Sequence, residues 1–137
     1  MQLSKNVRIT KTANLASAAT SAVDGTAVDT TGFQGVTFAA EIAVANAGNH
    51  LTVQQSDASN TGFTALDGAK SVCAVNGDVC VVDVKNPQKR YLRGVITRTA
   101  STASGALMAY SYGPSKAPVT HGSTVQVAAV VAPDEED

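Results

Sequence analysis

The segment "GVTFAAEIAV" spans Gly35–Val44 and carries its largest apolar side chains at every second position. A β-strand places successive side chains on opposite faces of its sheet, so residues two apart share a face. One face of this segment carries Val36, Phe38, Ala40, Ile42 and Val44, and the other carries Thr37, Ala39, Glu41 and Ala43. The pattern predicts a strand that turns one face toward a hydrophobic core.

The same two-residue period recurs in four other segments. They are "NHLTVQQSD" (49–57), "KRYLRGVITRT" (89–99), "SGALMAYSYG" (104–113) and "STVQVAAVVAP" (123–133). In the third, one face carries Ala106, Met108, Tyr110 and Tyr112. Turn-forming pairs such as Asp24-Gly25 and Asp67-Gly68 separate the segments. Eight to ten short strands at this spacing predict an all-β fold, a single-domain β-sandwich or jelly roll over residues 1–137.

The two ends of the chain differ from this pattern. Residues 1–20 combine scattered basic residues with a Ser/Thr/Ala-rich stretch, which predicts an extended N-terminal arm. Residues 132–137 read "APDEED" and predict an acidic, flexible tail. Both ends are candidates for reaching neighbouring molecules and becoming ordered on contact.

The net charge and the hydropathy of the chain argue against binding to nucleic acid and to membranes. The formal net charge is −1, from 10 basic and 11 acidic residues, so no global field attracts nucleic acid or anionic lipid. No segment approaches the ~18 consecutive apolar residues of a membrane span, and no apolar run typical of a signal peptide opens the chain. We therefore expect a protein made in a cytoplasm, with neither a nucleic-acid nor a membrane partner.

Two cysteines lie within "VCAVNGDVC" (72–80). Asn76-Gly77 is a strong signal for a two-residue type I′ hairpin, in which both central residues have positive φ. Counting outward from that turn places Cys73 opposite Cys80 on adjacent strands, with Cα atoms about 5.5 Å apart. A reduced pair and a cross-strand disulfide both fit this geometry. A zinc site lacks the further ligands it needs, so we expect neither metal nor cofactor.

The sequence contains no recognisable set of catalytic residues. His50 falls where a predicted loop enters a strand and His121 in another predicted loop, and neither has a carboxylate beside it in sequence to orient the ring. "SDASNTG" (56–62) spaces oxygen-bearing side chains like a calcium loop but has no distal glutamate. The expectation is a protein that is not an enzyme.

The segment "KNPQKRYLRGVITR" (85–98) contains five basic residues and no acidic one. Such charges often belong to a solvated edge strand, where they prevent sheet-to-sheet association. A docking face for an acidic protein surface is the second interpretation. Nucleic-acid binding is the third, and it would require more aromatic platforms than the chain offers.

The order of motifs resembles that of capsid decoration, or cement, proteins of short-tailed bacteriophages. The resemblance runs from about Thr31 to Val119 and includes "GFQGVTFAAEIA", "LTVQQSDASNTGFTAL" and "RYLRGVITRTASTASGALMAYSYGPSKAPV". It implies a β-sandwich on the outer surface of a virion, binding a major capsid protein of the HK97 type. It also implies a homo-oligomer, a homodimer or alternatively a trimer, that bridges capsomers and stabilises the shell.

Several basic residues are candidate contacts for the capsid protein in that role. They are Lys5, Arg8, Lys11, Lys89, Arg90, Arg93 and Arg98. Related β-sandwich modules occur in phage necks, tails and fibres, so a receptor- or glycan-binding module is the alternative function. The absence of tryptophan weakens a sugar-binding interpretation, because sugar sites usually present exposed aromatic rings.

Overall fold

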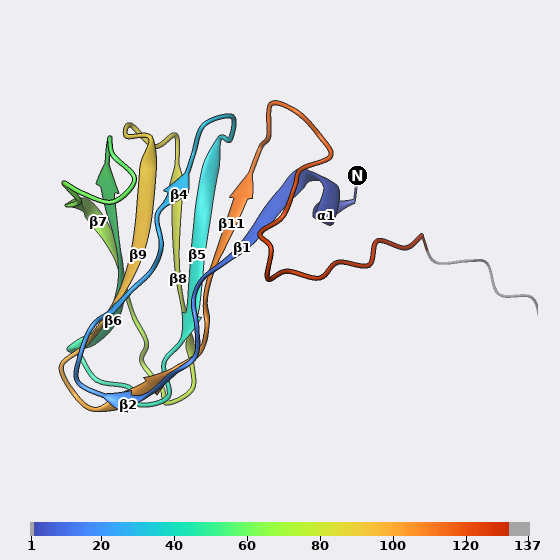
Figure 1. Ribbon diagram of the computed structural model, residues 1–137. Helices are drawn as coiled ribbons and strands as arrows, with labels where there is room; N and C mark the ends of the chain where they lie inside the picture. Colours follow the sequence, from blue (N-terminus) through green and yellow to red (C-terminus); the bar gives the residue numbers. More distant parts are fainter. Residues whose placement is uncertain (1, 132–137) are drawn as a thin grey trace, which may run out of the picture.

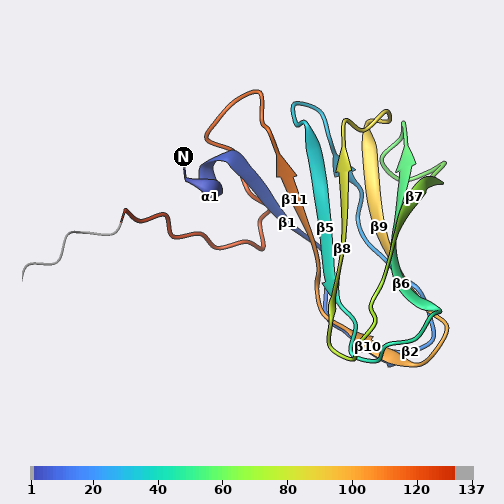
Figure 2. The same cartoon turned by 180° about the vertical axis from the view of Figure 1, so that it is seen from behind.

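The computed structural model describes residues 2–131 and shows two antiparallel β-sheets packed face to face (Figures 1 and 2). Its elements are α1 (Leu3–Asn6), β1 (Val7–Ala13), β2 (Ala16–Ala19), β3 (Val23–Asp24), β4 (Val28–Asp29), β5 (Gly35–Glu41), β6 (Asn49–Ser56), β7 (Thr64–Val72), β8 (Val79–Lys85), β9 (Tyr91–Arg98), β10 (Thr102–Ser104) and β11 (Leu107–Tyr112). The predicted all-β sandwich is confirmed. Its finer assignment as a jelly roll stays a prediction.

The first sheet has the strand order β1-β11-β5-β8, and the second has the order β3-β9-β6-β7 with β4 also paired to β9. A short ribbon of β2 and β10 closes the lower end of the sandwich in Figure 1. The loops that precede β5, β7 and β9 lie together at the upper end. Because consecutive strands often fall in different sheets, most contacts are long-range.

The core forms between the two sheets where the alternating side chains meet. Val36, Phe38, Ala40 and Ile42 are all buried, as the two-residue period predicted. They meet a second set from the other strands, which comprises Leu51, Val53, Leu92, Ile96, Leu107 and Ala109. Val44 is wrongly predicted, because β5 has ended before it and its side chain is exposed.

The predicted N-terminal arm is wrong for residues 7–19. Residues 7–13 form β1, which pairs with β11 from Val7↔Tyr112 to Ala13↔Leu107. Residues 16–19 form β2, which pairs with β10. Pairing satisfies the backbone hydrogen bonds of this stretch within the chain, and Thr12 is buried as a result.

The predicted strand at residues 123–133 is also absent from the part that the structure describes. Residues up to 131 follow an extended path that leaves the sandwich on the β1 side (Figures 1 and 2). The preceding residues contact α1 and the outer edge of β1: Val119 N–H donates to Lys5 O of α1 at 3.0 Å, and Gly122 N–H donates to Ile9 O of β1 at 3.1 Å. The predicted acidic tail, residues 132–137, lies outside the described residues.

The hairpin predicted at Asn76-Gly77 is a connection between the two sheets. β7 belongs to one sheet and β8 to the other, and no ladder pair joins them within residues 2–131. Gly77 has φ +81°, but Asn76 is not among the residues with positive φ, so the turn is not type I′. Tertiary bonds hold it: Gly77 N–H donates to Ile42 O at 3.0 Å, and Ala45 N–H to Asn76 Oδ1 at 2.8 Å.

Cys73 and Cys80 nonetheless meet, and they form a disulfide with a Cα–Cα distance of 5.6 Å. The bond closes the lower part of the sandwich on the side where β7 and β8 are edge strands. It joins the two sheets rather than two strands of one ladder.

Candidate docking surfaces

A cluster of arginines and aromatic rings occupies the upper end of the sandwich. Arg90 binds the Asp29 carboxylate through two nitrogens, at 3.2 and 2.9 Å. Arg8 Nη2 donates to the backbone oxygen of the same residue at 2.9 Å. Arg8 also lies over the Phe33 ring and Arg90 over the Tyr91 ring, with 4.7 and 5.1 Å to the ring centroids. β1, β4 and the start of β9 thus position both guanidinium groups within the chain's own network.

Arg90 holds the pKa of Asp29 down to about 2, since the ion pair and its hydrogen bonds favour the charged carboxylate. The N–H of Thr31 donates to the same carboxylate at 3.0 Å and acts in the same direction. A depressed carboxyl pKa contributes stability above the unfolded value, and that contribution is lost as the pH falls from about 4 toward 2.

We expect Arg90→Gln to raise the pKa of Asp29 toward its unperturbed value of about 3.9, because the charged partner is removed while the Thr31 bond remains. The side-chain carboxyl carbon resonance of Asp29, followed by NMR from pH 1.5 to 6 (roughly the span that contains both values), measures this directly. Arg93→Gln is the control and should leave the Asp29 midpoint unchanged. A midpoint still near 2 in Arg90→Gln would show that the ion pair is not the cause.

Two other basic residues of the segment 85–98, Lys89 and Arg93, also have partners within the chain. Lys89 pairs with Asp57 at 3.0 Å. Arg93 donates to the Gln54 side-chain oxygen and lies 4.4 Å from the Phe63 ring centroid. The contact of Lys89 and Arg93 with a capsid protein stays a prediction. A capsid protein would have to displace their partners within the chain or bind these partners as well. Lys5 and Lys11 form no ion pair among residues 2–131.

Arg98 is not a docking residue, and its assignment as a capsid contact is wrong. The residue is 4% exposed. Its guanidinium donates to the backbone oxygens of Ser21, Ser17 and Thr102 at 2.7, 2.8 and 2.8 Å. It therefore fixes the β2–β10 ribbon to the end of β9. Arg98 is separated from Leu92 and Ile96 by an even number of residues, so the two-residue period of a strand puts all three side chains on the same face. That period could have predicted the burial of Arg98.

The sheet β1-β11-β5-β8 presents an outer face that the basic-residue prediction did not include. Its side chains alternate with the buried core residues, so they point away from the second sheet. In register across the strands, one row is Lys11, Met108, Ala39 and Val81, and the next row is Ile9, Tyr110, Thr37 and Asp83. These residues are half-buried in the first three strands and exposed on β8. We call this surface the outer face.

A third row of the outer face consists of Val7, Tyr112, Gly35 and Lys85, and the Tyr112 ring lies over Gly35. Tyr112 Oη donates to Asp83 Oδ1 at 2.8 Å, so the tyrosine on β11 reaches across β5 to β8. A Cβ on Gly35 would collide with the Tyr112 ring, which explains the glycine at this position. Burial and the bond to Asp83 raise the pKa of Tyr112 to about 12, so the hydroxyl remains a donor at physiological pH. The face is therefore a fixed, uncharged platform at its centre.

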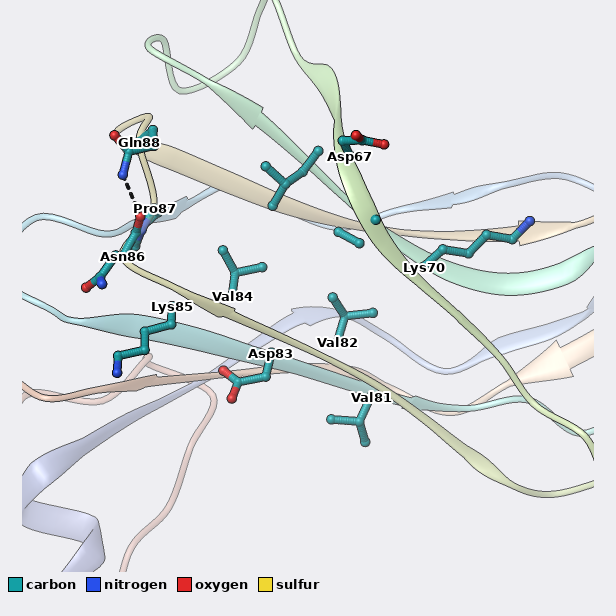
Figure 3. Close-up of a pocket in the computed structure, with 13 residues that line it drawn as sticks. Asp67, Lys70, Val81, Val82, Asp83, Val84, Lys85, Asn86, Pro87 and Gln88 are labelled. Carbon is teal, nitrogen blue, oxygen red and sulfur yellow. Dashed lines mark hydrogen bonds between the residues drawn. The ribbon is translucent and has the colours of Figure 1, made fainter.

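A groove opens between the edges of β7 and β8, on the side opposite β1. It has a volume of about 520 Å³ and is lined by residues 66–70 of β7 and residues 81–88 of β8 and its following loop. Figure 3 shows Val82 and Val84 pointing from β8 toward the strand that carries Asp67 and Lys70. Both charged signs line the groove, and its floor is apolar.

The two histidines lie apart and have different environments. His121 Nδ1 accepts from Ile9 N–H at 2.9 Å, and Nε2 lies 2.6 Å from Ser4 O, so a neutral ring with hydrogen on Nε2 satisfies both contacts. His50 lies on β6, where burial and the charge of Lys70 lower its pKa. Within residues 2–131, no group of three His, Cys, Asp or Glu side chains is arranged to hold a metal ion.

In the same part of the chain, no helix has the length and apolar character to cross a membrane. Comparison of the chain with models of known protein families gives no match, and comparison with curated proteins gives none either. What this chain can bind is therefore inferred from its own surfaces.

Proposed function

We propose that this chain is a non-enzymatic structural protein that binds the outside of an HK97-type phage capsid and bridges neighbouring major capsid proteins. The observation that carries the proposal is the outer face, whose centre on β11 and β5 has uncharged side chains and whose charged residues, Lys11 and Asp83, lie on the outer strands β1 and β8. Such a face suits adhesion to a broad protein surface, because burial of apolar area supplies free energy without a deep pocket. The resemblance to decoration proteins of short-tailed phages supports the same role.

Stabilisation of a shell requires only that the protein prefer one lattice state. A ligand that binds the expanded shell and not its precursor shifts the equilibrium by mass action. A homodimer, or alternatively a trimer, would present several outer faces at once, so weak individual contacts would add to tight attachment. Lys11 adds a positive charge at the β1 side of the outer face. Lys5, Arg8, Lys89, Arg90 and Arg93 remain candidate contacts for acidic groups, with Arg93 on the solvent side of the other sheet.

We expect Ala39→Glu to weaken binding to empty expanded shells about tenfold or more, which corresponds to about 1.4 kcal/mol. The new carboxylate would stand at the centre of the outer face and would have to be desolvated in the complex. Co-sedimentation of purified protein with shells that lack it measures the affinity.

Ala65→Glu is the matched control, since Ala65 is an exposed strand residue on β7 of the other sheet. Circular dichroism and thermal melting should show both variants folded. Equal loss of binding in the two variants, or no loss in Ala39→Glu, would reject the outer face as the shell contact.

A receptor- or glycan-binding module of a neck, tail or fibre is the second candidate. Tyr110 and Tyr112 lie half-buried beside Asp83 on the outer face, which combines aromatic rings with a polar group as sugar sites do. Both proposals use the same face, and they differ in how many copies a particle carries.

A further inference from the structure

The segment Val125–Val131 has the sequence of a strand but pairs with no strand in the part of the chain that the structure describes. Val125, Val127, Ala129 and Val131 alternate with Gln126, Ala128 and Val130, and no charged residue interrupts them. In the structure these residues are extended and most are exposed, with Val130 73% and Val131 82% accessible. An exposed run of valines is costly in water, so a missing partner is indicated.

The start of this segment is fixed on the β1 edge of the sandwich. Gly122 N–H donates to Ile9 O at 3.1 Å, and His121 accepts from Ile9 N–H at 2.9 Å. Val125 N–H then donates to Gly122 O at 3.0 Å, which closes a turn. From there the chain leaves the body in both views of the molecule (Figures 1 and 2).

At the opposite edge of the same sheet, no strand from residues 2–131 pairs with β8 on its outer side. β8 pairs with β5 on one side, and on its other side the groove separates it from β7. An edge strand presents unpaired backbone N–H and C=O groups, which form a template for another extended segment. The groove floor is apolar, because Val82 and Val84 point into it (Figure 3) and Leu66 and Ala69 are only half-buried there. Val79 and Val81 are exposed on the outer side of the same strand.

We propose that Val125–Val131 of one copy adds as a strand to β8 of a second copy and fills the groove between β7 and β8. The two strands match in length, since the segment has seven residues and β8 has seven. Alternate side chains of the donated strand would cover the groove floor, and the others would lie beside Val79 and Val81. This contact concerns two copies of the chain, so it goes beyond attachment to a shell.

The chain cannot make this contact with its own β8. Gly122 lies outside β1, and a strand added to β8 would lie five strand spacings away, about 24 Å. Three Cα-to-Cα steps from Gly122 to Val125 span at most about 11 Å. The donor and the acceptor must therefore belong to different molecules.

Purified full-length chain, without shells, tests the inference. We expect the wild type to self-associate in sedimentation equilibrium, and Val127→Asp with Ala129→Asp to weaken self-association about a hundredfold, because two carboxylates would enter the donated strand. Ala58→Asp with Ser59→Asp is the matched control, since it adds the same charge to an exposed loop that does not line the groove. Amide hydrogen exchange should show residues 81–85 protected in the wild type and in the control, and less protected in the donor variant.

A monomeric wild type would overturn the inference, as would a donor variant that associates like the wild type. Dissociation of the control to the same extent, or equal exchange of residues 81–85 in all three proteins, would also overturn it. Protection of β8 that arises only on shells would mean that the capsid protein fills the groove instead. None of these results decides the outer-face proposal. That proposal is tested separately by Ala39→Glu, and Ala39 does not line the groove.

Discussion

Replacing Phe38 by alanine is expected to lower the free energy of unfolding by about 3–5 kcal/mol, the range for large-to-small changes at well-packed aromatic sites. The ring is fully buried on β5, between the two sheets. The ring also favours glycine at position 94 of the facing strand β9, because a Cβ on Gly94 would lie 3.1 Å from the Phe38 ring. Both strands have backbone hydrogen bonds on each side and therefore cannot collapse into the cavity. Urea denaturation followed by circular dichroism measures the change.

Phe38→Leu is the control for the size of the cavity and should lose about half as much stability, since it retains most of the buried apolar volume. Leu15 is largely exposed, so Leu15→Ala should change the free energy of unfolding by less than about 0.5 kcal/mol. A loss of under about 1 kcal/mol for Phe38→Ala would contradict the core described here, because it would mean that the ring is not packed between the sheets.

Replacing Arg98 by methionine is expected to cost about 3 kcal/mol, as three backbone carbonyls lose a charged donor at a buried site. Methionine keeps the unbranched shape of the side chain, so the loss reports the hydrogen bonds more than the packing. The affected carbonyls belong to Ser17, Ser21 and Thr102, at the ribbon that closes the lower end. Chemical denaturation measures this loss in the free energy of unfolding. Amide hydrogen exchange of residues 16–21 should also become faster, because these residues lose their attachment to Arg98.

Arg98→Lys separates charge from geometry. One ammonium group reaches fewer of the three carbonyls than a planar guanidinium does, so it should recover part of the stability. If Arg98→Met were as stable as the wild type and lost shell binding instead, Arg98 would be a surface contact and the burial described here would be wrong.

The two-residue period predicted the strands whose inner faces are all apolar. Val36, Phe38, Leu51 and Ile96 could be placed in the core from the sequence, because burial of a strand face leaves a pattern within a few residues. The same period extended to Arg98 would have placed it inside, but a charged residue was assigned to the surface on its chemistry alone. A buried arginine needs carbonyls from distant segments, and those cannot be read from the local sequence.

Turn signals predicted less than strand patterns did. Asn76-Gly77 indicated a hairpin, yet its turn is also bonded to Ile42 and Ala45, which lie in the distant segment that follows β5. The assignment of β7 and β8 to different sheets is a property of the whole topology. The outer face is another such property, because the Tyr112–Asp83 bond across Gly35 joins three strands that are distant in sequence.

The basic residues show why sequence charge is a weak guide to a binding surface. Lys89, Arg90 and Arg93 form a run in the sequence, but each has a partner on a different element. Exposed ion pairs such as those of Lys89 and Arg90 contribute about 0–1 kcal/mol each to stability, so they can exchange for intermolecular partners at small cost. The uncharged centre of the outer face has apolar side chains that a partner can bury without desolvating a charge, and for that reason we propose the main contact there.

The central claim is that this protein coats the outside of a capsid shell, and its copy number in purified particles tests that claim most directly. Quantitative mass spectrometry of virions, with the major capsid protein as internal reference, gives the ratio. We predict a copy number proportional to that of the major capsid protein, with the protein released when the outer surface is stripped. A copy number fixed by a single vertex, or no protein in the particle at all, would contradict it.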